Sequence, residues 1–145
     1  GEYGIAFDLT ITTPGLFSLK DLFDLSLELD VHTLIKTTFA FESSIMMCPQ
    51  VLPRELFNEV IDDVLDFIKP KIEANPKFGY WITCLEDLKN RQVFSEKYPD
   101  WREGLKSGKE RLAKVDKFRR NEGVLDKIYL ENNKKVYDWW KSNLI

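Results

Sequence analysis

The sequence predicts an α+β fold, in which an N-terminal antiparallel sheet of three or four strands is packed by three or four helices. Two stretches near the N-terminus alternate apolar and polar residues, as strands with one buried face do. From residue 53 onward, apolar residues recur instead at the spacing of amphipathic helices. The chain has 145 residues, 43% of them hydrophobic, so we expect a single domain over 1–145.

The N-terminal half supplies the predicted strands. The first covers 3–11, and a short helix over 18–24 follows a turn at Thr13-Pro14-Gly15. Alternation returns over 25–42, which is too long for an ordinary strand. We therefore expect two strands, 25–31 and 33–41, or one long bent strand. The side chains of the first strand expected in the core are Tyr3, Ile5, Phe7 and Leu9.

The remaining elements are mostly helical. Pro53 suits the first position of a helix, and Pro70 should end or kink that helix. A strand is predicted over 78–84, followed by a short helix. Another helix begins at Pro99 and should stop at Gly123, and a last helix runs from about Val124 to Ser142.

Charge is distributed unevenly along the chain. Residues 1–100 carry 9 Lys/Arg and 17 Asp/Glu, whereas residues 101–145 carry 12 and 7. The first part is therefore net −8 and the second net +5. Such asymmetry indicates either a surface with two differently charged sides or two parts that pair with each other in the fold.

No recognisable catalytic or metal-binding motif is present. The single histidine, His32, cannot form a multi-histidine site, and Cys48 and Cys84 do not have metal-ligand spacing. We expect both cysteines to be thiols, with a disulfide as the alternative, and no metal or cofactor. We also expect a soluble protein of the cytoplasm with no membrane span.

Two charged surfaces are candidate binding sites. One is the acidic side of the helix that begins at Pro53, which is a solvated face, a set of ligands for a divalent cation or a surface for a basic partner. Its residues are Glu59, Asp62, Asp63 and Asp66. The other is the basic segment 102–120, which is either a solvated helix or a phosphate-binding stripe. Its residues are Lys106, Lys109, Lys114, Lys117, Arg119 and Arg120.

Trp139 and Trp140 are the third candidate. Adjacent residues of a helix project about 100° apart, so one indole should enter the core while the other stays partly exposed. An exposed Trp is a common anchor of protein interfaces, although two buried Trp side chains are the commoner outcome.

We hypothesise a non-catalytic protein–protein interaction domain that uses Trp139, Trp140, Asp62, Asp63 and Asp66. In composition this acidic, aromatic-rich domain is similar to immunity proteins, adaptors and effector-binding modules. The alternative is a nucleic-acid binder that uses segment 102–120. A third hypothesis is an enzyme whose site assembles from distant residues.

Overall fold

The computed structural model describes residues 4–37 and 42–142, and the predicted fold class is wrong. The described part is mostly helical, and its single sheet has two parallel strands rather than three or four antiparallel ones. Strand β1 (Ala6–Ile11) and strand β2 (His32–Thr37) pair from Ala6–His32 to Ile11–Thr37. Helix α1 (Leu19–Leu29), preceded by the 3-10 turn η1 (Pro14–Ser18), connects them. Parallel pairing requires a crossover of this kind.

The predicted strand 25–31 is therefore wrong, because residues 25–29 belong to α1. This helix buries Leu19, Phe23 and Ser26, which follow helical rather than alternating spacing. It ends at Asp30, whose left-handed backbone (φ 54°) lets its N–H bond to carbonyls of the last turn.

Strand β1 is also less buried than predicted. Phe7 and Leu9 are half-buried, and Ile5 is 78% exposed, so only Ile11 of this strand lies fully in the core. Tyr3 lies outside the described residues, as does the end of the predicted strand 33–41.

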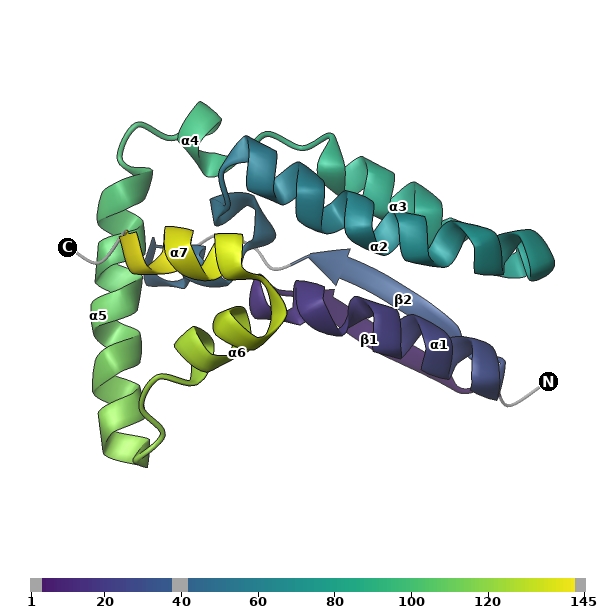
Figure 1. Ribbon diagram of the computed structural model, residues 1–145, viewed down its shortest axis with the longest axis horizontal. Helices are drawn as coiled ribbons and strands as arrows, with labels where there is room; N and C mark the ends of the chain where they lie inside the picture. Colours follow the sequence, from purple (N-terminus) through teal and green to yellow (C-terminus); the bar gives the residue numbers. More distant parts are fainter. Residues whose placement is uncertain (1–3, 38–41, 143–145) are drawn as a thin grey trace.

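Helix α2 (Arg54–Ala74) and helix α3 (Tyr80–Lys89) pack together on the β2 side of the molecule (Figure 1). The helix predicted from Pro53 is confirmed, but α2 continues through Pro70 to Ala74. The predicted strand 78–84 is wrong: residues 76–78 form a 3-10 turn, η4 (Pro76–Phe78), and α3 follows. The buried side chains of α3 are Trp81, Leu85 and Leu88, at four- and three-residue spacing.

The other end of the molecule is built from helix α5 (Trp101–Arg119), helix α6 (Val124–Asn132) and helix α7 (Lys134–Ser142) (Figure 1). The short helix α4 (Phe94–Lys97) leads into α5. The helix predicted from Pro99 is confirmed, but it ends at Arg120 in a left-handed conformation, before Gly123. The predicted last helix is two helices, separated at Asn133, where the backbone is extended.

One hydrophobic cluster joins the two ends. It includes Ile11 of β1, Phe23 of α1, Ile61 of α2 and Trp140 of α7. Between β2 and α2, the 3-10 turns η2 (Glu42–Met47) and η3 (Pro49–Val51) carry the chain across, and η2 packs against α5. Among the described residues, no helix is long and apolar enough to cross a membrane.

Candidate functional site

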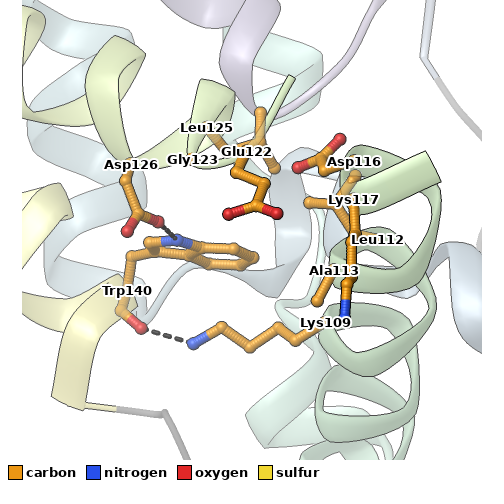
Figure 2. A pocket seen from close by; sticks show the side chains of 10 residues that line it. All are labelled: Lys109, Leu112, Ala113, Asp116, Lys117, Glu122, Gly123, Leu125, Asp126 and Trp140. Atoms are coloured by element: carbon orange, nitrogen blue, oxygen red, sulfur yellow. Dashed lines mark hydrogen bonds between the residues drawn. The ribbon is translucent and has the colours of Figure 1, made fainter. Parts of the chain in front are cut away.

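A polar cluster next to the core lies where α7 packs on α5 and α6. The indole of Trp140 is only 4% exposed, and its Nε1–H donates to Oδ1 of Asp126 at 2.6 Å. The other carboxylate oxygen of Asp126 accepts from Nζ of Lys141 at 2.7 Å. Lys109 of α5 lies with its ammonium 4.0 Å from the centre of the Trp140 ring, and donates to the Trp140 carbonyl oxygen (Figure 2).

Lys109 acts as a cap for the C-terminus of α7. The Trp140 carbonyl belongs to the last turn of that helix, where carbonyl oxygens lack partners within the helix and favour cations. Burial lowers the pKa of Lys109 to about 8; the carboxylate of Asp126 opposes this shift and the ammonium of Lys141 adds to it. Lys109 is therefore held by α7 and does not share a solvent-facing stripe with the other lysines of α5.

A cleft of about 490 Å³ opens beside this cluster, between α5 and α6 (Figure 2). Four apolar side chains, those of Leu112, Ala113, Leu125 and Trp140, line it together with charged residues of both signs. The lining includes Leu112, Asp116, Lys117, Glu122, Leu125 and Trp140. The titratable groups with shifted pKa values, Lys109 and Asp126, already bond to Trp140.

The two tryptophans point into different environments, as their adjacency predicts. Trp140 lies in the core, with its ring centre 5.6 Å from that of the buried Tyr129. Trp139 is half-buried, and its ring centre lies 6.3 Å from that of Trp140. Its role as an interface anchor stays a prediction.

The acidic side of α2 is bonded to lysines of the same chain. Asp63 pairs with Lys20 at 2.6 Å, and Asp62 with Lys89 at the same distance. Glu59 pairs with Lys135 of α7 at 3.1 Å. Asp66 is exposed, and no ion pair of its own is described within residues 4–37 and 42–142. Three of the four carboxylates are thus already neutralised within the chain.

The basic helix keeps most of its predicted cations on the surface. The exposed ones are Lys106, Lys114, Lys117, Arg119 and Arg120, and they form no ion pair described within residues 4–37 and 42–142. Beside them Phe118 is 90% exposed. In the described part of the chain, the pair between Lys135 and Glu59 is the ion pair that joins the two differently charged parts.

The single histidine and the two cysteines do not form a catalytic or metal-binding group with one another in the described part of the chain. His32 is exposed, and its ring centre lies 4.5 Å from that of Tyr80. Cys48 is buried, which raises the pKa of its thiol to about 11 and disfavours the reactive thiolate. Cys48 and Cys84 form no disulfide. Among the described residues, no group of three His, Cys, Asp or Glu side chains is placed to hold a metal ion.

The two edges of the sheet differ, a feature that sequence reasoning missed. On β2, the backbone N–H of Thr33 donates to the hydroxyl of Tyr80 at 2.8 Å, and Arg91 donates to the Thr37 hydroxyl at 2.5 Å. Residues of α3 and the segment after it therefore cover the β2 edge. On β1, no third strand pairs with the outer edge in the described part of the chain.

Comparison of this chain with protein-family models, with characterised proteins and with solved structures finds no match.

Proposed function

We propose that this chain is a non-catalytic protein–protein interaction domain, of the adaptor, immunity or effector-binding type. The observation that carries the proposal is the incomplete sheet. Parallel strands occur almost entirely in sheets whose two faces are covered, and an isolated two-stranded sheet is marginal in water. Here the described sheet has two parallel strands, and no third strand of the described residues pairs with the outer edge of β1.

Exposed apolar side chains at the same end of the molecule support the proposal. Of the eight large hydrophobic residues that are exposed in the described part, four belong to the first thirty-four residues. They are Ile5, Leu25, Leu29 and Leu34. Contiguous exposed apolar surface is typical of sites that bind other proteins. We also propose that the protein is cytoplasmic. The two cysteines form no disulfide, which is typical of proteins in a reducing compartment.

Nucleic-acid binding through α5 is the second candidate, favoured by one observation. The six exposed cations from Lys106 to Arg120, which include Arg111, form no ion pair with the acidic part of the chain within the described residues. Such cations are free to neutralise phosphates, and an exposed aromatic ring such as Phe118 can stack on bases.

The two functions predict opposite responses in a binding experiment. The tagged chain is captured from its native source, and the recovered partner and mixed-sequence nucleic acid are each titrated at two salt concentrations. Protein binding predicts a stoichiometric protein partner whose affinity survives the combined substitutions Lys106→Gln, Lys114→Gln and Lys117→Gln. A nucleic-acid affinity that falls steeply with salt, and that this triple variant abolishes, would contradict our proposal.

A further inference from the structure

The free edge of β1 carries a regular row of backbone hydrogen-bonding groups. Thr33 of β2 points its N–H away from β1, toward Tyr80, so the neighbouring residues Leu34 and His32 bond to β1. Asp8 lies opposite Leu34 in the ladder, which makes Phe7 and Leu9 the β1 residues that bond to β2. The N–H and C=O groups of Ala6, Asp8 and Thr10 therefore point outward, and these three residues are exposed.

A flank of α1 beside this edge is apolar and exposed. Leu22, Leu25 and Leu29 project within about 60° of one another on the helix. Leu25 is 41% exposed and Leu29 is 53% exposed, although both lie in a helix that covers a sheet. Exposed apolar surface of this kind is typical of a site that another apolar surface covers.

This leucine flank lies on the β1 side of the molecule. The opposite flank of α1 bonds to α2, through Lys20 with Asp63 and Asp24 with Lys71. Helices α2 and α3 lie along the β2 side, whose edge Tyr80 covers (Figure 1). The leucine flank, on the side of α1 away from α2, therefore adjoins the uncovered edge of β1.

Charge indicates the chemistry of the missing neighbour. Asp21 and Glu28 border the leucine flank on its solvent side, and both are exposed. Neither has an ion pair described within residues 4–37 and 42–142. A helix that packs here would place its own border against two carboxylates, which favours lysine or arginine at that border.

We propose that the β1 edge and the leucine flank of α1 together dock a strand–helix unit of a separate protein. The partner strand extends the sheet by parallel pairing with Ala6, Asp8 and Thr10. The partner helix, apolar on one side and basic at its border, covers Leu25 and Leu29. This inference rests on the proposed protein-binding function and specifies its surface. Strand addition is a common mode of peptide recognition because the exposed backbone itself supplies the hydrogen bonds.

Photo-crosslinking in the native source locates the surface. A photoreactive amino acid replaces Thr10 or Leu25 in the full chain, with Trp139 and Lys114 as control positions on the opposite end. We expect Thr10 and Leu25 to crosslink to one and the same partner protein. Adducts from Trp139 alone would contradict the docking surface but leave the protein-binding function standing. Adducts to a second copy of this chain would contradict the separate partner, and the absence of adducts at all four positions would contradict both proposals.

Substitutions then test the mode of binding against the crosslinked partner. Thr10→Pro removes one outward N–H, and a lost hydrogen bond corresponds to an affinity loss of about tenfold. Thr10→Ala keeps that N–H and should bind like the parent chain. Because Thr10→Pro can also disturb β1, Leu25→Asp provides an independent test on α1, with unfolding of each variant measured in parallel. Parental affinity in both Thr10→Pro and Leu25→Asp would overturn the proposal.

Discussion

Polar groups are bonded within the chain at the α5–α7 end of the molecule, whereas at the β1–α1–β2 end many of them face solvent. At the α5–α7 end, Lys109, Trp140 and Asp126 bond to one another, so that a lysine and a helix end next to the core are satisfied. At the end formed by β1, α1 and β2, backbone groups and leucines meet solvent. The comparison teaches that a buried charged group can be fully bonded within its own chain, whereas the backbone groups at the β1 edge have no strand partner in the described part of the chain.

Some buried polar atoms depart from this pattern. Among the described residues, the atoms without a hydrogen-bond partner are Thr33 Oγ1, Gln50 Oε1, Trp81 Nε1 and the Tyr129 hydroxyl. The hydroxyl of Tyr129 is buried at the α5–α7 end without a hydrogen-bond partner among the described residues. Burial raises the pKa of this phenol, so it stays protonated in the folded chain. Its ring nevertheless packs closely against Trp140 and Phe17, which links α6 to both ends of the molecule.

The largest expected effect on stability is at the α5–α7 end. Trp140→Ala should lower the free energy of unfolding by about 3–5 kcal/mol, because it leaves a cavity and removes one of the two hydrogen-bond donors to Asp126. Urea denaturation measures this loss. Trp139→Ala is the matched control and should cost less, because Trp139 is only half-buried. Equal losses for the two variants would contradict the different environments of the two indoles.

Lys109 should make the stability of the folded chain depend on pH. Its pKa is lowered from 10.5 to about 8 in the folded chain, so the unfolded chain binds more protons between those values. The contribution of Lys109 to stability therefore increases as pH rises from 8 to 10.5. The stability difference between the parent chain and Lys109→Met, measured by denaturation across this range, isolates the effect from the titrating thiols. A difference that is constant with pH would show that Lys109 is not held in this environment.

The ion pairs of α2 should contribute less to stability than Trp140 or Lys109 does. Asp62→Ala should cost no more than about 1 kcal/mol, because the Asp62–Lys89 pair is partly exposed. Asp66→Ala, with no described ion pair, should change stability by less than about 0.5 kcal/mol. A loss of several kcal/mol for Asp66→Ala, recovered on adding a divalent cation, would instead indicate a metal site on this face.

The smallest effect on stability is expected at the leucine flank of α1. Leu29→Ser should change the stability of the isolated chain by less than about 0.5 kcal/mol, because Leu29 is exposed there. Phe23→Ala, on the buried side of the same helix, should cost about 3–5 kcal/mol. Thermal unfolding of the two variants tests the contrast, and a large loss for Leu29→Ser would mean that the leucine flank is already covered.

The sequence predicted α2 and α5 correctly because their apolar residues fit only a helical period. It failed in α1 because leucine is too frequent there to distinguish two periods. Leu25, Leu27 and Leu29 alternate as in a strand, yet Leu22, Leu25 and Leu29 also form one helical flank. The β-branched residues that favour a strand begin only at Val31, and the left-handed cap at Asp30 is not evident from its residue type alone.

The candidate surfaces could be predicted only in part. Adjacency of Trp139 and Trp140 was enough to place them in different environments. The burial of Lys109 depends on how α7 packs on α5, which is a tertiary contact between residues 31 positions apart. The open edge of β1 was missed because parallel pairing was not foreseen. The high frequency of leucine between residues 22 and 29 was the available signal for that surface.

Amide hydrogen exchange along β1 tests most directly whether this edge is open. In the isolated chain, the amides of Asp8 and Thr10 should exchange at least about tenfold faster than those of Phe7 and Leu9, which bond to β2. Exchange at single residues is resolved by NMR on the same sample, so the inward-facing amides serve as the internal control. Slow exchange at Asp8 and Thr10 equal to that of Phe7 and Leu9 would show that the edge is already paired, and would contradict the account.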